Sequence, residues 1–251
     1  MEPNDNKFVS NIKNRYLDEL QEDFQLLAEI VLSQLDELKT LLENINEESV
    51  QKQLSRNEKL IDSLDLSIKE KVINAIILFT PKAVDLRKIM TYYDMTISME
   101  RVGDLIQNIA KSIKKSDFTL DGFDEFLKYL EKMQTYASDM LRSAVYSFNG
   151  ENNEMAYQTI MKDSKVDKWD KKMEKHLAEA FQNENLSNQM LVNIMNLNVI
   201  SYYIERIADK AVDIASAAIY LIEGKDIRHD QFSNKKHKED TSSTPTEETM
   251  E

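Results

Sequence analysis

The chain of 251 residues contains no cysteine, only four glycines and only three prolines. Without cysteine it has no disulfide, no zinc–thiolate site and no cysteine nucleophile, and its composition suits a reducing compartment. Glycine and proline both weaken helix interiors, so their scarcity favours long uninterrupted helices. Alternation typical of strands is hard to find as well. The sequence therefore predicts an all-α protein.

Long apolar runs are also missing. No run approaches the roughly 18 residues that a membrane-spanning helix needs, and the first residues, MEPNDNKF, lack the basic and then apolar order of a signal peptide. The formal net charge of −13 argues against a nucleic-acid partner, because a phosphate backbone would be repelled. We expect a cytoplasmic protein that is not transmembrane and that binds cations or a basic protein surface.

Apolar residues recur at helical spacing through most of the chain. They predict six long helices, at about 7–48, 49–79, 81–115, 123–148, 151–184 and 187–223. Pro81 suits the first turn of the third helix, with Thr80 as its N-cap. Gly150 and Gly224 suit the ends of the fourth and sixth helices. The segment 225–251 has little that could form a core and is predicted to be a disordered, polar and acidic tail.

An internal repeat organises these helices. Glu100-Arg101-Val102-Gly103-Asp104 corresponds to Glu205-Arg206-Ile207-Ala208-Asp209, 105 residues later, and the comparison needs no gap. A fixed offset of this kind indicates duplication. Because short loops favour antiparallel neighbours, we predict two tandem antiparallel three-helix bundles related by a pseudo-two-fold axis, at residues 1–116 and 117–224.

The same offset joins carboxylates on the second and fifth predicted helices. Glu58 and Asp62 correspond to Asp163 and Asp167, and Asp65 corresponds to Asp170. Single acidic pairs four residues apart are common in so acidic a chain, where about eight arise by chance. What indicates a site is therefore the recurrence of four pairs at one offset, and any single pair alone indicates nothing.

Residues four apart on a helix lie on one face, so each pair presents two carboxylates together. Glu100–Asp104 and Glu205–Asp209 are predicted to lie opposite the apolar stripes of their helices. Like charges at this spacing repel, and Arg101, Arg206 or a bound cation could compensate. Oxygen ligands suit Mg, Mn, Ca or iron. The alternative is an acidic helix face that is only solvated.

Three motifs together resemble the PhoU family of phosphate-uptake regulators. They are Glu58-x-x-Ile61-Asp62-x-x-Asp65, then Pro81-x-Ala83-x-Asp85-Leu86-Arg87, then Glu100-Arg101-Val102-Gly103-Asp104-x-x-x-Asn108-Ile109-Ala110. The resemblance covers about residues 7–224. The second repeat lacks the proline motif, and Gly103 and Asn108 become Ala208 and Asp213. The two sites could therefore differ in affinity or in metal.

The resemblance implies an acidic metal cluster on each bundle that holds iron, Mn, Mg or Zn. Carried over residue by residue, the implied ligands are Glu58, Asp62, Glu100, Asp104, Asp163, Asp167, Glu205 and Asp209. Further ligands or supporting groups would be Asp65, Asp170, Asn108, Asp213, Arg101 and Arg206.

The resemblance also implies function. The chain would be a negative regulator of phosphate uptake, an adaptor that modulates a Pst-type ABC phosphate transporter and a sensor histidine kinase at the cytoplasmic face of the membrane. A homodimer is left open. The alternative is a helical scaffold for another phosphate permease, with a metal-free acidic face.

An enzyme is not expected. Di-iron carboxylate bundles need Glu-x-x-His pairs, and none of His176, His229 and His237 follows a glutamate at that spacing. A convincing nucleophile–base set and a glycine-rich phosphate loop are missing too.

Overall fold

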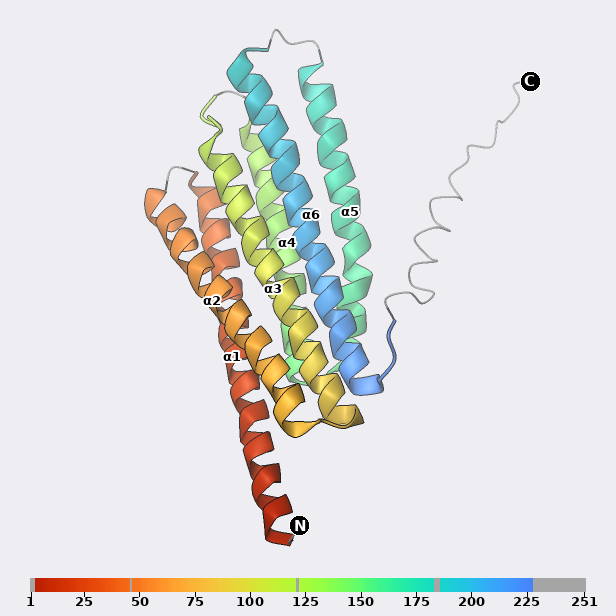
Figure 1. Cartoon of the computed structure of the whole chain (residues 1–251). Helices are drawn as coiled ribbons and strands as arrows, with labels where there is room; N and C mark the ends of the chain where they lie inside the picture. Colours follow the sequence, from red (N-terminus) through yellow and green to blue (C-terminus); the bar gives the residue numbers. More distant parts are fainter. Residues whose placement is uncertain (1–2, 46, 121, 183–185, 228–251) are drawn as a thin grey trace, which may run out of the picture.

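The computed structural model describes residues 3–45, 47–120, 122–182 and 186–227 (Figure 1). This part of the chain forms six α-helices and contains no strand. The helices are α1 (Pro3–Glu43), α2 (Glu48–Phe79), α3 (Ala83–Lys114), α4 (Asp124–Asn149), α5 (Asn153–Phe181) and α6 (Asn188–Glu223). The all-α prediction and its helix count are confirmed for these residues, with ends displaced by a few positions.

Local signals explain several helix ends. The side chains of Asn152 and Ser187 accept hydrogen bonds from the backbone N–H groups of Met155 and Met190 and so cap α5 and α6. Gly224 ends α6 in the left-handed conformation, with φ +72°. The predicted role of Thr80 was wrong: it ends α2, with φ +39°, and Lys82 precedes α3. Thr80 adopts a left-handed conformation that an N-cap does not have.

The helices form two antiparallel bundles, α1–α3 and α4–α6, packed side by side. Helix α3 packs on α6 and α1 packs on α4, so these four helices make an inner layer. Each outer helix packs on two inner ones, α2 on α1 and α3, and α5 on α4 and α6. Figure 1 shows α2, α3, α6 and α5 side by side. Since α3 meets its counterpart α6, and α1 meets α4, the arrangement fits the predicted pseudo-two-fold repeat.

One hydrophobic core runs through both bundles. At the junction Phe24 of α1, Tyr92 of α3 and Phe148 of α4 make a trio whose ring centroids lie 5.3–5.6 Å apart. The buried Gln134 side chain donates from Nε2 to the carbonyl of Leu35, 2.7 Å away, across the same junction. Aromatic contacts and a buried hydrogen bond therefore hold the two repeats in one register.

The connector between the repeats adds an aromatic side chain to the core. Phe118 is buried in it, beside Phe123, and Phe123 stacks on Phe181 of α5. At the other end the chain stays packed beyond α6, because Ile227 is 6% exposed. Residues 228–251, most of the predicted tail, lie outside the described residues.

Candidate functional site

The seam between α2 and α3 brings together the carboxylates that the first repeat was predicted to present. We call Glu58, Asp62 and Asp65 of α2 with Glu100 and Asp104 of α3 the first carboxylate cluster. Asp62, Glu100 and Asp104 all act electrostatically on Glu58, while Asp104 and Asp65 act on Glu100. Residues 35 to 46 positions apart in sequence therefore share one acidic site.

Glu58 is the most perturbed group of this cluster. Burial, then the charges of Asp104 and Asp62, raise its pKa to about 7, and the pKa of Glu100 is raised for the same kinds of reason. Its carboxyl lies within hydrogen-bonding reach of Asp104, yet its buried Oε2 has no hydrogen-bond donor. Two ionised carboxylates cannot share a hydrogen bond, so a proton or a cation is needed here.

The seam between α5 and α6 repeats the arrangement. The second carboxylate cluster consists of Asp167 and Asp170 of α5 with Glu205 and Asp209 of α6. Burial first, and then Asp209 and Asp167, raise the pKa of Glu205 to about 7, against the opposing effect of Arg206. The Oε2 of Glu205 is buried without a hydrogen bond, like that of Glu58. Asp163 lies one turn earlier on α5, half-buried.

Each cluster has one arginine at its rim, as predicted. Arg101 pairs with Asp104 at 3.4 Å, and Arg206 pairs with Asp209 at 2.9 Å. The two clusters differ at their more buried ends, around Asp65 in the first and Asp170 in the second. Asp65 pairs with Lys69 at 2.8 Å, whereas Glu174 stands at the position equivalent to Lys69 and raises the pKa of Asp170. The second cluster is therefore the more acidic at this end.

The carboxylates lie deeper than the helix pattern predicted. Glu100 and Glu205 face the outer helices and are half-buried, and Asp65 is only 7% exposed. The prediction placed Glu100 and Glu205 opposite the apolar stripes of their helices because it considered one helix at a time, and the outer helix covers that side. Of the lesser candidates, Asp213 pairs with Lys210 at 2.6 Å, and Asn108 is half-buried one turn beyond Asp104.

The donor chemistry of both clusters suits a hard or borderline cation, since all the converging groups are carboxylates. The buried Oε2 atoms of Glu58 and Glu205, which have no hydrogen-bond donor, mark where the positive charge of a cation would be most stabilising. In the described part of the chain, however, no three His, Asp or Glu side chains already stand in positions to hold a metal ion together. Binding would therefore require the flexible carboxylates to rotate.

The proline motif has a structural role that sequence reasoning did not assign. Asp85 pairs with Lys13 of α1 at 2.7 Å. The Arg87 guanidinium lies over the Tyr220 ring, 5.6 Å from its centroid, and against Gly224. These contacts tie the start of α3 to α1 and to the end of α6.

None of the described helices contains an apolar stretch that could span a membrane. The family model described as "PhoU domain" matches the chain twice, at 24–113 and 130–218. The two matches end 105 residues apart, at 113 and 218, which is the offset of the internal repeat.

Proteins of similar sequence and solved structures of similar fold also carry the name PhoU. The chain is 26% identical to the phosphate-specific transport system accessory protein PhoU homolog of Clostridium acetobutylicum, over 84% of this chain and 94% of that protein. In fold it resembles the phosphate transport system regulatory protein PhoU of Streptococcus pneumoniae, with a TM-score of 0.75, 20% identity and coverage of 85% and 98%. PhoU of Pseudomonas aeruginosa gives a TM-score of 0.78 at 20% identity, with coverage of 84% and 99%. Two family-model matches over most of the chain, at the spacing of its own repeat, show that it belongs to the PhoU family.

Proposed function

We propose that this protein is a non-catalytic adaptor that binds one or more divalent cations at each carboxylate cluster and regulates a phosphate transporter. The observation that carries the proposal is that each cluster contains one glutamate oxygen, of Glu58 in the first and of Glu205 in the second, buried among carboxylates without a hydrogen-bond donor. A bound cation would neutralise several carboxylates at once and join an outer helix to an inner one. Iron, Mn, Mg and Zn are the candidates.

The partners follow from the names of the relatives. An accessory protein of a phosphate-specific transport system would dock on the transporter at the cytoplasmic face of the membrane. We further propose a Pst-type ABC transporter and a sensor histidine kinase as the partners, with the adaptor damping uptake and signalling. The net charge of −13 favours a basic docking surface on the partner. A homodimer stays a prediction.

Metal content tests the cation proposal directly. The full chain is purified gently, incubated with Fe, Mn, Mg and Zn in turn, desalted and measured by mass spectrometry. The variants are Glu100→Gln/Asp104→Asn and Glu205→Gln/Asp209→Asn. The matched control is Asp18→Asn/Glu22→Gln, which removes the same charge from an exposed face of α1. We expect each cluster variant to lose the metal of one repeat and the control to lose none.

Equal metal content in all four proteins, or none in any, would contradict cation binding at the clusters. Partner binding is then measured separately, by co-purification with transporter and kinase components. If both cluster variants capture the partners as well as the wild type does, partner binding does not depend on the metal.

The competing function is a metal-free scaffold for another phosphate permease. Two observations favour this alternative. Basic side chains already neutralise part of each cluster, namely Arg101 and Lys69 in the first and Arg206 in the second. Among the described side chains, no three ligands already stand in positions to hold a metal ion together. Under this alternative Glu58 and Glu205 would be held protonated near neutral pH.

A further inference from the structure

A groove lies between the first half of α2 and the last half of α3, about 630 Å³ in volume. Four basic side chains line it, Lys52 and Arg56 from α2 and Lys111 and Lys114 from α3, with Glu48 as the one carboxylate among the lining residues. We call it the α2–α3 groove. It concentrates positive charge on a protein whose net charge is −13, so it calls for an explanation other than general composition.

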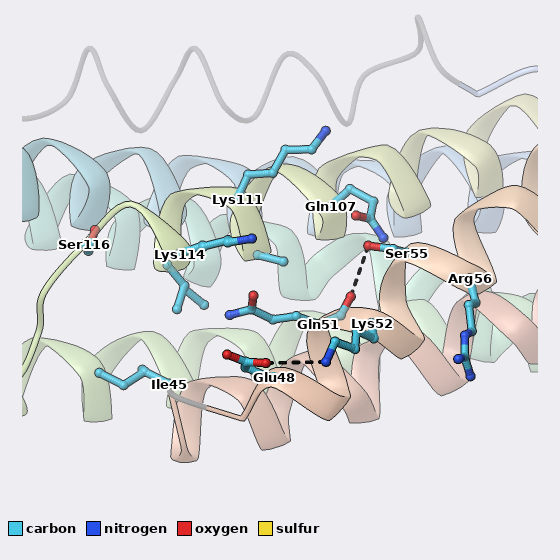
Figure 2. A pocket seen from close by; sticks show the side chains of 12 residues that line it. Ile45, Glu48, Gln51, Lys52, Ser55, Arg56, Gln107, Lys111, Lys114 and Ser116 are labelled. Atoms are coloured by element: carbon cyan, nitrogen blue, oxygen red, sulfur yellow. Dashed lines mark hydrogen bonds and ion pairs between the residues drawn. The ribbon is translucent and has the colours of Figure 1, made fainter.

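Figure 2 shows how the side chains lie. Lys114 and Gln51 extend into the space between the helices, and Lys111 and Arg56 stand at its margins. Lys52 pairs with Glu48 at 3.4 Å. Within the described residues, the other three cations form no ion pair, so their charges are not neutralised by the protein.

Gln107 provides an independent sign of a ligand. Its side chain belongs to the groove lining and is 8% exposed, and its buried Nε2 has no hydrogen-bond acceptor. Leaving an amide donor buried and unbonded is unfavourable. An acceptor that enters the groove would satisfy it. Cations around a buried donor are the arrangement that an anionic oxygen ligand requires.

The second repeat shows that the fold does not need these residues. At the equivalent positions Lys52, Arg56, Lys111 and Lys114 are replaced by Tyr157, Met161, Ser216 and Ile219, and Gln107 is replaced by Val212. There the start of α5 is bonded to the end of α6 instead, through Asn153 and Glu223 at 2.8 Å. A lysine in the last turn of α3 also suits the helix dipole, but that reason does not extend to Arg56 within α2.

We infer that the α2–α3 groove binds a small organic phosphate or a polyphosphate, a ligand with at least one phosphoryl group and larger than inorganic phosphate. The four cations would face the phosphoryl oxygens, and Gln107 would donate to one of them. Ile45, Ala110 and Ile113 add apolar surface for the rest of the molecule. A volume of about 630 Å³ falls within the range of small-molecule sites. The inference does not rest on the carboxylate clusters.

Calorimetric titration of the full chain tests it, with inorganic phosphate, pyrophosphate and ATP as separate probes. EDTA keeps metal ions out of the experiment, and about 0.15 M salt screens unspecific attraction. The variants are Lys111→Gln/Lys114→Gln and, separately, Gln107→Leu. The matched control is Lys168→Gln/Lys171→Gln, two exposed lysines with the same spacing on α5.

We expect one molecule of pyrophosphate or ATP to bind per chain. Both groove variants should weaken binding at least tenfold and the control should leave it unchanged. Glu48→Gln, which removes the lining carboxylate, should tighten it. Circular dichroism checks that the variants are folded, and the lysine pair keeps the test valid if Gln107→Leu is not. Binding of inorganic phosphate alone, of none of the probes, or an equal loss in the control would overturn the inference.

Discussion

Gly103 of α3 lies directly against Glu58 of α2: a Cβ atom at position 103 would stand 3.2 Å from the Glu58 Oε2 atom. The second repeat has Ala208 and Asp163 at these positions. In the sequence, the longer carboxylate therefore goes with glycine and the shorter one with alanine. Such an exchange would keep the volume at the seam between outer and inner helix nearly constant, as close packing requires.

This relationship predicts that Gly103→Ala and Glu58→Asp are coupled. Alanine should gain up to about 1 kcal/mol over glycine inside a helix, but in the wild-type background the contacts with Glu58 and Ile61 oppose that gain. In the Glu58→Asp background the gain should appear. Urea unfolding of the four proteins measures the coupling, which we expect to exceed about 0.5 kcal/mol. Equal effects of Gly103→Ala in both backgrounds would contradict the packing argument.

The raised pKa of Glu58 predicts a pH-dependent stability of the metal-free protein. The folded chain holds a proton on Glu58 up to about pH 7, whereas the unfolded chain releases it near the ordinary value of 4.5. The contribution is therefore complete below 4.5 and is lost as the pH rises to about 7. Glu58→Gln should flatten this part of the profile in EDTA, measured by urea unfolding from pH 4.5 to 8. The exposed control Glu22→Gln should not.

Ser201 should tune the second cluster. Its Oγ donates to Oδ1 of Asp170 at 2.6 Å, which lowers the Asp170 pKa against the larger effect of burial. Ser201→Ala should therefore raise that pKa further and cost about 1 kcal/mol at neutral pH. Carbon-detected NMR titration of Asp170 measures the pKa. Ser201→Thr is the matched control, because threonine keeps a hydroxyl group at this position, and it should preserve the hydrogen bond.

Gly224 should be intolerant of a side chain. It has φ +72°, and a Cβ there would lie 2.6 Å from an Arg87 nitrogen. Gly224→Ala should cost about 1–3 kcal/mol, through backbone strain and displacement of Arg87, and lower the melting temperature by several degrees. Gly150→Ala, at a helix end with φ −95°, should cost less. A similar loss at both glycines would show that Arg87 contributes little.

This prediction rests on the proposed cation sites: the Lys69 charge should weaken cation binding in the first repeat. Lys69→Glu makes the first cluster resemble the second, where Glu174 stands at this position. We expect tighter metal binding in the first repeat, because a cation beside Asp65 is replaced by a carboxylate. Competition with a metal indicator measures the affinity, and Lys59→Glu on the exposed face of α2 is the control. No change relative to that control would place Lys69 outside the site.

The helices and their repeat were predictable because helical periodicity and a fixed offset are properties of the sequence itself. Glu58, Asp62, Glu100 and Asp104 were likewise predicted to converge, and the structure brings them to one seam. The depth of that seam was not predictable, because the burial of Asp65 and Glu100 depends on how α2 and α3 pack against each other.

Other features depend on contacts between distant segments. The contact of Gly103 with Glu58, of Arg87 with Tyr220, and of Asn193 with Asp117 joins residues whose spacing shows no pattern. The α2–α3 groove was missed for a related reason. Its basic residues are separated in sequence and are ordinary surface lysines until the two helices lie together.

The layered arrangement also has a consequence for hydrogen exchange. Helices α2 and α5 each pack on only two neighbours, whereas α3, α4 and α6 contact three or more elements of the fold. An outer helix can therefore open locally while the inner layer stays closed, and its amides should exchange first. Both carboxylate clusters and the α2–α3 groove lie at seams where an outer helix meets an inner one. A ligand bound at one of these seams should slow amide exchange in the outer helix of that seam. Exchange in α2 would therefore report binding to the first repeat, and exchange in α5 would report binding to the second.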